Sequence, residues 1–274
     1  MDIKAFKMDG LGNDFVIIDQ RSQNFNLSKD QIVKICDRNF IGCDQLIFIQ
    51  KSEKKDAGLE FYNSDGSISG ACGNGTRCVA DLLSKENNDK EITLWTSSGS
   101  LKSKILENNL VETEIGVPKT SWNEIPLNKD LDTKDLNIKI VSKNNIAYVG
   151  GTSINVGNPH IIFFVDNIED YNLEKIGPEI ENHKYFPEKC NVTLAKVISR
   201  NLIKVKVWER GAGLTKACGT AACATAVAGN INGLTDKKTD IEFALGRLLI
   251  SIDENNSVHM KGPVSDIKNI EINI

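Results

Sequence analysis

Apolar residues along this chain fall in short blocks that Gly, Asn, Asp or Pro interrupts, a pattern typical of β-strands. In the first half it predicts strands at residues 3–6, 15–19, 46–50, 60–63, 92–96, 101–106 and 110–115. In the second half it predicts strands at residues 146–154, 161–165, 192–197, 202–208, 241–245, 248–252, 258–261 and 267–274. Within the first of these, Gly150-Gly151 predicts a bulge or turn. Each half is therefore expected to be built mainly of strands.

Few segments have the signals of a helix. A capping-box pattern begins at Ser28 and predicts a helix through about residue 38. Its apolar residues, expected on the buried side, are Ile32, Val33, Ile35 and Cys36. Pro178 predicts that another helical segment is broken into residues 173–176 and 178–182. Residues 119–135 are polar and are expected to form a connector that lies partly on the surface.

Two further helices are each expected to begin after a cysteine. Residues 71–78 read Ala-Cys-Gly-Asn-Gly-Thr-Arg-Cys, and residues 217–223 read Ala-Cys-Gly-Thr-Ala-Ala-Cys. Each stretch opens a run of small residues that predicts a helix, to about residue 84 and residue 229. A helix N-terminus lowers a thiol pKa, because its dipole and its backbone N–H groups favour the thiolate. The same N–H groups can bind an anion.

The two halves match beyond these stretches. The paired positions are Asn13 and Asn158, Gln45 and Asn191, Cys72 and Cys218, and Glu107 and Glu254. Their separations are 145, 146, 146 and 147 residues. A spacing that holds over most of a chain indicates an internal repeat, and a period of this size corresponds to a domain. We therefore expect two copies of one α+β domain, each with many strands around one long helix.

The composition fits a globular protein of this size. The 274 residues are 40% hydrophobic and 26% charged, with a net charge of −4. No basic block is present, so we expect no nucleic-acid partner. The first residues are charged and no apolar stretch is long enough to span a bilayer, so we expect the cytoplasm and no membrane partner. Seven cysteines, an odd number without an export signal, favour thiols over disulfides.

The paired cysteines suggest a reaction. Two like domains related by an approximate twofold axis would place Cys72 and Cys218 on opposite sides of a bound ligand. One thiolate could then remove a proton from a carbon while one thiol delivers a proton to the opposite face, which inverts a stereocentre. No sequence feature marks a lysine for a pyridoxal Schiff base, so we expect no cofactor. Two helix N-termini could instead stabilise the substrate carboxylate.

The repeat differs at one informative place. Asn63-Ser64 of the first copy corresponds to Glu209-Arg210 of the second. An added arginine suggests that the substrate carries a second carboxylate, because the guanidinium group binds carboxylates with two parallel hydrogen bonds. The simpler interpretation is that Glu209 and Arg210 are a solvated loop pair.

Seven motifs resemble those of the diaminopimelate epimerase family, in the same order along nearly the whole chain. They are residues 10–15 (Gly-Leu-Gly-Asn-Asp-Phe), Asp44-Gln45, residues 63–67 (Asn-Ser-Asp-Gly-Ser), residues 72–78, residues 157–160 (Gly-Asn-Pro-His), residues 209–213 (Glu-Arg-Gly-Ala-Gly) and residues 217–220 (Ala-Cys-Gly-Thr). The resemblance implies a cofactor-independent isomerase that interconverts LL- and meso-diaminopimelate in the synthesis of lysine and peptidoglycan precursors. It also implies a homodimer.

The resemblance further implies a fold of two pseudo-symmetric domains. Each would be a strongly curved, barrel-like, mostly antiparallel sheet around a central helix. The first domain would comprise residues 1–117 with a returning C-terminal strand at 264–274, and the second would comprise residues 118–263.

The resemblance also implies roles for individual residues. Cys218 would be the base for the LL isomer and Cys72 the base for the meso isomer. The reacting end would contact Asn13, Gln45, Glu209 and the helix starts at Gly73, Asn74, Gly219 and Thr220. The distal end would contact Asn63, Asn158, Asn191 and Arg210. His160 and Glu209 would tune the pKa of the thiols.

Other interpretations remain open. Asn13 alone would be a turn residue and His160 a structural histidine, while Cys36, Cys78 and Cys223 would be buried and inert. A proline racemase-like enzyme would use the same fold and the same pair of cysteines. A redox protein would instead form a regulatory disulfide between Cys72 and Cys218. Zinc is not expected, because the spacings C-x5-C and C-x4-C lack a following His pair. Neither a complete dinucleotide fingerprint nor a P-loop is present.

Overall fold

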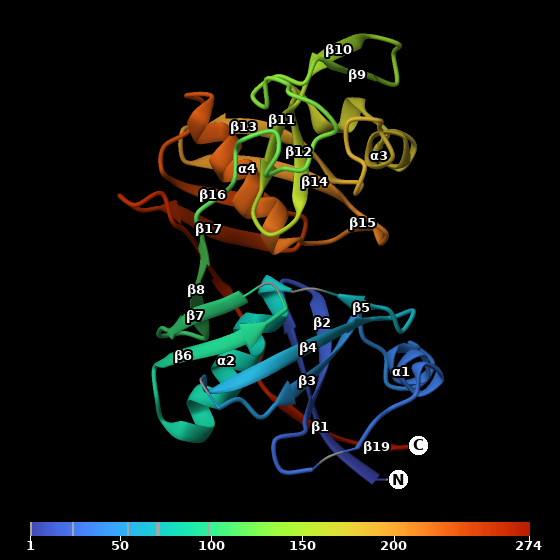
Figure 1. Ribbon diagram of the computed structural model, residues 1–274, viewed down its shortest axis with the longest axis vertical. Helices are drawn as coiled ribbons and strands as arrows, with labels where there is room; N and C mark the ends of the chain where they lie inside the picture. Colours follow the sequence, from blue (N-terminus) through green and yellow to red (C-terminus); the bar gives the residue numbers. More distant parts are fainter. Residues whose placement is uncertain (1, 24, 54, 70–71, 98) are drawn as a thin grey trace. The chain divides into compact units, whose positions relative to one another are not determined.

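The computed structural model describes residues 2–23, 25–53, 55–69, 72–97 and 99–274. The chain forms two compact units, Met1–Glu114 with Lys261–Ile274, and Ile115–Met260 (Figure 1). Each unit has its own set of paired strands and its own central helix, so the two are described separately.

The first unit is built mainly of strands. They are β1 (Asp2–Gly10), β2 (Asn13–Asp19), β3 (Gln45–Gln50), β4 (Ala57–Asn63), β5 (Ile68–Ser69), β6 (Glu91–Thr96), β7 (Gly99–Ile105), β8 (Leu110–Gly116) and β19 (Lys268–Asn273). β2 pairs with β3 and β4 with β6 in parallel, and the other pairs formed among these strands are antiparallel. β19 lies beside β1, which brings the C-terminus next to the N-terminus (Figure 1). The predicted strand at residues 267–274 therefore returns to the first unit.

Two helices cover opposite faces of this sheet. The apolar residues of β2 alternate, so that Phe15 and Ile17 pack with α2 (Gly73–Asn87) while Val16 and Ile18 pack with α1 (Lys29–Cys36). α2 contacts β1, β2, β6 and β7 and is the central helix (Figure 1). It approaches closely because Gly75 has no side chain: a Cβ there would lie 2.7 Å from Ile47 Cδ1.

The capping box at the start of α1 is confirmed, with Gln31 N–H donating to Ser28 Oγ and Ser28 N–H donating to Gln31 Oε1. The prediction that Val33 faces the core is wrong, since its side chain is 39% exposed. Ile32, Ile35 and Cys36 are buried and already form the i, i+3, i+4 stripe. Val33 lies one residue, and thus about 100° around the helix, from this stripe.

The second unit repeats the plan of the first. Its strands are β9 (Ile138–Val141), β10 (Ala147–Gly150), β11 (Thr152–Asn155), β12 (Pro159–Phe164), β13 (Asn191–Ser199), β14 (Leu202–Glu209), β15 (Gly213–Thr215), β16 (Lys238–Phe243), β17 (Gly246–Ile252) and β18 (Val258–Pro263). Its helices are η1 (Ile168–Asp170), α3 (Leu173–Glu181) and the central α4 (Gly219–Ile231).

The pairing pattern shows the internal repeat most clearly. β2, β3, β4, β5, β6 and β7 have as counterparts β12, β13, β14, β15, β16 and β17. In both series the first two strands are parallel, the third is antiparallel to the second and fourth, and it is parallel to the fifth. α2 and α4 follow the fourth strand of their series. The predicted α+β fold with two pseudo-symmetric copies is confirmed.

One detail of the second unit differs from the sequence predictions. α3 is continuous through Pro178, because Leu173, Ile176 and Ile180 bury one apolar face that outweighs the missing hydrogen bond. The strand predicted at residues 146–154 is interrupted at Gly151, where the Gly150-Gly151 pair predicts a bulge or turn. It forms β10, which pairs with β9, and β11, which pairs with β12.

Residues 119–135 lie partly on the surface, as predicted, while Ile125 and Leu127 are buried in the core of the second unit. Among the helices of the described residues, none has both the length and the hydropathy that crossing a membrane requires.

Candidate active site

Cys72 stands at the start of α2, where the chain is still extended. As the N-cap residue it has φ −141° and ψ 111°. Its carbonyl oxygen accepts hydrogen bonds from the Thr76 backbone N–H at 2.8 Å and from the Thr76 hydroxyl at 2.9 Å. The side chain is half-buried. Ala71, which begins the motif, lies outside the described residues. The predicted placement of Cys72 at a helix N-terminus is confirmed.

Two asparagines of the predicted site lie beside the Cys72 thiol. Asn13 is the first residue of β2, and its Oδ1 accepts a hydrogen bond from Cys72 Sγ at 3.6 Å. The same oxygen accepts a hydrogen bond from Asn74 Nδ2 at 3.3 Å. Asn74 is the second residue of α2 and is 1% exposed. Asn13 therefore accepts from both the thiol and the buried amide.

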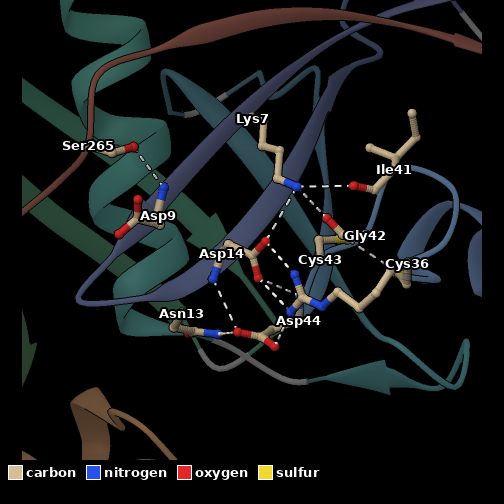
Figure 2. A network of polar contacts seen from close by, with 11 residues as sticks. Lys7, Asp9, Asn13, Asp14, Cys36, Ile41, Gly42, Cys43, Asp44 and Ser265 are labelled. Atoms are coloured by element: carbon tan, nitrogen blue, oxygen red, sulfur yellow. Dashed lines mark hydrogen bonds and ion pairs between the residues drawn. The ribbon is translucent and has the colours of Figure 1, made fainter. Parts of the chain in front are cut away.

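A network of charged side chains holds the far side of Asn13. Asn13 Nδ2 donates to Asp44 Oδ2 at 3.1 Å, and Asp44 also pairs with Arg38 at 2.6 Å (Figure 2). Arg38 donates two hydrogen bonds to Asp14, and Lys7 Nζ lies 3.6 Å from Asp14 Oδ2. Burial alone would raise the pKa of Asp14, but Arg38 and Lys7 hold it below its ordinary value. Sequence reasoning assigned no role to Arg38, Asp14 or Lys7.

Gln45 and Asn63 lie on neighbouring strands of the same unit. They are opposite each other in the register of β3 and β4, and Gln45 Nε2 donates to Asn63 Oδ1 at 2.9 Å. Asn63 Nδ2 in turn donates to Ser67 Oγ at 3.0 Å, across the turn that Gly66 closes. In the first repeat the structure thus places Asn13 in contact with Cys72 and Asn74, and Gln45 in contact with Asn63.

Cys218 occupies the same place in the second unit. It is the N-cap residue of α4, with φ −135° and ψ 115°, close to the values of Cys72. Its Sγ lies 3.4 Å from Thr220 Oγ1. The side chain is 5% exposed.

The environment of Cys218 corrects the expectation of a lowered thiol pKa. Burial and the nearby Glu209 carboxylate raise the pKa of Cys218 well above its ordinary value, although Thr220 and the Ala221 N–H favour the thiolate. The helix N-terminus is therefore outweighed by desolvation and by a like charge. The surroundings of Cys218 therefore favour the thiol over the thiolate.

His160 and Asn191 are opposite each other in the register of the parallel strands β12 and β13. His160 Nε2 hydrogen-bonds Asn158 Oδ1 at 2.8 Å. The ring is fully buried, and burial together with the positive charge of Arg210 lowers the pKa of His160 to about 3. His160 is therefore neutral at physiological pH, and its ring contacts the side chain of Asn158.

Arg210 lies in the exposed loop between β14 and β15. Its backbone N–H donates to Asn191 Oδ1 at 3.0 Å, and its guanidinium donates to the Glu188 carbonyl at 2.9 Å. The loop is also anchored by Glu181, whose two carboxylate oxygens accept from Trp208 Nε1 at 2.7 Å and from the Gly211 N–H at 3.1 Å.

The role of Glu181 in holding the Arg210 loop was not predicted, because Glu181 lies in α3, far along the chain from that loop. Gly177 marks the close approach of α3 to Trp208: a Cβ there would lie 2.4 Å from Trp208 Cγ, so the position requires a glycine.

The cysteines outside the two N-caps are buried. Cys78 and Cys223 are 0% exposed, as predicted, and burial raises the pKa of Cys78 and of Cys190. Cys43 Sγ donates to Cys36 Sγ at 3.4 Å within the core between α1 and the sheet. Among the described residues, no group of three or more His, Cys, Asp or Glu side chains is arranged to hold a metal ion.

Comparison with known proteins gives consistent relatives over the whole chain. The family model described as diaminopimelate epimerase matches residues 5–121 and 152–267. A diaminopimelate epimerase of Pelagibacter ubique is 78% identical over 274 residues, covering 100% of both chains. One of Carboxydothermus hydrogenoformans is 41% identical over 268 residues, covering 95% of this chain and 96% of its own.

Solved structures with low sequence identity share the fold. A predicted epimerase of Pseudomonas aeruginosa has a TM-score of 0.70 at 15% identity, covering 98% of this chain and 99% of its own. A hydroxyproline epimerase of Agrobacterium vitis with bound trans-4-hydroxy-L-proline has a TM-score of 0.69 at 11% identity, covering 98% of this chain and 91% of its own.

Proposed function

Because this chain belongs to the diaminopimelate epimerase family, we propose that it inverts one α-carbon of diaminopimelate by proton transfer to and from the thiols of Cys72 and Cys218. The chain is an isomerase that interconverts LL- and meso-diaminopimelate, a reaction of lysine biosynthesis. The observation that carries the two-thiol mechanism is that both cysteines are N-caps of the equivalent central helices, with nearly equal backbone angles.

The proposed reaction is balanced without any other reactant. The thiolate of one cysteine takes the α-proton from one face of the carbon, and the thiol of the other gives its proton to the opposite face. The first cysteine ends as the thiol and the second as the thiolate, so the two roles are exchanged after each turnover. By analogy with the family, we assign Cys218 as the base for the LL isomer and Cys72 as the base for the meso isomer.

Removal of an α-proton moves negative charge onto the substrate carboxylate. The proposed donors to this carboxylate are the first backbone N–H groups of α2 and α4, at Gly73, Asn74, Gly219 and Thr220. They have no acceptor within the helix and carry the positive end of its dipole, worth about half a unit charge. Such preorganised donors stabilise the charge as it develops, because they need no rearrangement during the reaction.

Recognition of the two ends of the substrate is divided between different side chains. We assign the distal amino-acid group to Asn63, Asn158, Asn191 and Arg210, and the reacting end to Asn13, Gln45 and Glu209. The support for the distal set is structural: Arg210 and Asn191 are hydrogen-bonded, and Asn158 is held by His160. An arginine suits a second carboxylate, which diaminopimelate has.

Glu209 has a role in setting the protonation state of Cys218. Its carboxylate, together with burial, favours the thiol, so that Cys218 in the form described here is ready to donate a proton. His160 acts in this proposal through Asn158, since a ring with a pKa of about 3 stays neutral.

The remaining expectations rest on the family resemblance. We propose that the first repeat domain comprises residues 1–117 and 264–274, and the second residues 118–263. We also propose that two copies of the chain form a homodimer and that the protein works in the cytoplasm. Light scattering on the purified chain tests the dimer, because it gives the molar mass in solution directly.

Proton NMR in deuterium oxide tests the proposed function. Reduced protein is mixed with LL-diaminopimelate and no added cofactor. The α-proton signal is expected to decrease while the meso isomer appears, because each inversion delivers a solvent deuteron. Retention of the α-proton signal by protein with titratable thiols would contradict the proposal.

Single cysteine variants then test the two-thiol mechanism. Cys72→Ala and Cys218→Ala are each expected to stop the interconversion, since each removes the acid–base group on one face. Cys223→Ala is the matched control, because Cys223 is buried in the interior of α4, away from the N-cap. Interconversion that survives either active-site substitution would contradict the mechanism.

A further inference from the structure

The side-chain amides of Asn13 and Asn74 each have a charged partner that can bond in only one way. A carboxylate can only accept, so Asp44 Oδ2, at 3.1 Å, fixes the NH2 group of Asn13 on its own side. A guanidinium can only donate, so Arg77 Nη2, at 2.8 Å, fixes the oxygen of Asn74 on its side. Each asparagine must then direct its other amide atom towards the space beside Cys72.

This space is where the two amides meet. Asn74 Nδ2 donates to Asn13 Oδ1 at 3.3 Å, and Cys72 Sγ donates to the same oxygen at 3.6 Å. Asp44, Asn13, Asn74 and Arg77 therefore form one chain of hydrogen bonds, which has an acidic end at Asp44 and a basic end at Arg77. A flip of either amide would place two donors or two acceptors against each other at one of the charged ends.

Asp44 and Arg77 are themselves firmly held. The Asp44 N–H donates to the Asp14 side chain at 3.1 Å, the Asp14 N–H donates to Asp44 Oδ2 at 3.2 Å, and Arg38 pairs with both carboxylates (Figure 2). Arg77 is 0% exposed in the interior of α2. Neither charged side chain belongs to the proposed substrate-binding set.

We propose that Asp44 and Arg77 are positioning residues that lock the amides of Asn13 and Asn74, so that an oxygen, rather than an NH2 group, faces the sulfur of Cys72. This inference deepens the proposed function, on which it rests for the role of Cys72. An oxygen beside the sulfur accepts from the thiol and repels the thiolate. Cys72 is therefore kept as a more strongly basic group than it would be beside an NH2 donor, which suits the removal of a weakly acidic α-proton.

Other ionisable groups lie on the elements packed around α2 and after α1, and a change in the charge of any of them would also alter the electrostatic potential at this thiol. They are Lys7 and Asp9 on β1, Asp14 on β2, Arg38 after α1, Glu91 on β6, Lys102 and Lys104 on β7, and Arg77, Cys78 and Asp81 on α2. A test must therefore separate the loss of a negative charge from the loss of a locked amide.

The experiment is the pH dependence of alkylation of Cys72 by iodoacetamide, without substrate, in full-length reduced protein. Mass spectrometry of the Cys72 peptide separates its reaction from that of the other cysteines. Asp44→Asn keeps the shape but presents both a donor and an acceptor, so the 3.3 Å bond from Asn74 alone then orients the Asn13 amide. Asn13 can turn its NH2 group to the thiolate when this long bond is exchanged for a charge-assisted one. We expect the midpoint of Cys72 alkylation to fall by about one pH unit.

Asp14→Asn is the control matched in charge, because it removes one negative charge from the same network but leaves the bond between Asp44 and Asn13 in place. We expect its midpoint to stay close to that of the native protein. Coincident midpoints for Asp44→Asn and Asp14→Asn, or a rise in the midpoint of Asp44→Asn, would overturn the proposal. Asp44→Glu, which retains an acceptor-only side chain, is expected to restore the native midpoint.

Arg77→Lys tests the other end of the chain of hydrogen bonds and keeps a buried cation that only donates. We expect its Cys72 midpoint to remain native, and a fall as large as that of Asp44→Asn would overturn the role of Arg77 as the lock. The readout does not depend on turnover. A protein that fails to convert LL-diaminopimelate but shows the Asp44→Asn shift would remove the proposed function and still support the positioning of Asn13.

Discussion

Arg210 donates its backbone N–H to the side-chain oxygen of Asn191, at 3.0 Å. Asn191 is 2% exposed at the start of β13, and its Nδ2 donates to the Pro159 carbonyl at 3.0 Å. One buried amide therefore fixes the loop that carries Arg210 and the segment that carries Asn158. The residues of the second unit that are assigned to the distal subsite are thus held by the sheet as well as by the exposed loop.

Replacement of Arg210 by lysine is expected to lower kcat/KM for diaminopimelate about 10- to 100-fold, because an ammonium group cannot form two parallel bonds to a carboxylate. Steady-state kinetics by NMR measures the change. The matched control is Arg200→Lys, whose arginine is 64% exposed and pairs with Asp236 at the surface. Unchanged kcat/KM in Arg210→Lys would contradict the assignment of Arg210 to the distal carboxylate.

Glu181 is expected to stabilise the Arg210 loop against local and global unfolding. Glu181→Ala leaves the donors Trp208 Nε1 and Gly211 N–H without their carboxylate, and the free energy of unfolding should fall by about 1–3 kcal/mol. Urea denaturation measures this. Glu179→Ala, an exposed position of the same helix, is the control and should change stability by less than about 0.5 kcal/mol. Equal stability of the two variants would show that the Glu181 contacts contribute little.

Much of the fold could be predicted because it depends on local signals. The capping box at Ser28 and the apolar block at residues 15–19 each specify their own structure, and the structure confirms the start of α1 and strand β2. The spacing of 146 residues between Cys72 and Cys218 predicted the repeat, which recurs in the order of strand pairing. The N-cap position of each cysteine followed from the loop and the run of small residues around it.

The sequence could not show what depends on distant packing. The pKa of Cys218 is raised by burial and by Glu209, whereas the local motif indicated a lowered pKa. The bond between Glu181 and Trp208 joins residues 27 positions apart, and no periodic pattern marks it. Pro178 is tolerated in α3 because of the apolar face that this helix buries, which is a property of the whole unit.

The buried histidine should make stability depend on pH. The pKa of His160 is about 3 in the folded protein against 6.5 ordinarily, so the unfolded chain binds one more proton between these values. The contribution of the neutral, buried His160 ring to the free energy of unfolding is complete above pH 6.5 and is lost as the pH falls towards 3. Between pH 7 and pH 5 we expect the native protein to lose about 2 kcal/mol more stability than His160→Gln. Urea denaturation at both pH values tests this, and parallel losses would contradict a depressed pKa.

The protonation of Cys218 should respond in opposite directions to two substitutions. Burial and the Glu209 carboxylate raise its pKa, so Glu209→Gln removes a like charge and should lower the pH at which Cys218 is alkylated. The Thr220 hydroxyl favours the thiolate, so Thr220→Val should raise that pH.

Peptide-resolved alkylation without substrate measures both changes, and Glu254→Gln, an exposed carboxylate of the same unit, is the control for net charge. If Glu209→Gln and Glu254→Gln gave the same midpoint, the effect of Glu209 would be general electrostatics rather than a contact with the thiol. If Thr220→Val lowered the midpoint, the hydroxyl would be favouring the thiol. Opposite shifts in the two variants would show that one carboxylate and one hydroxyl set the proton on Cys218, the group proposed to act on one face of the α-carbon.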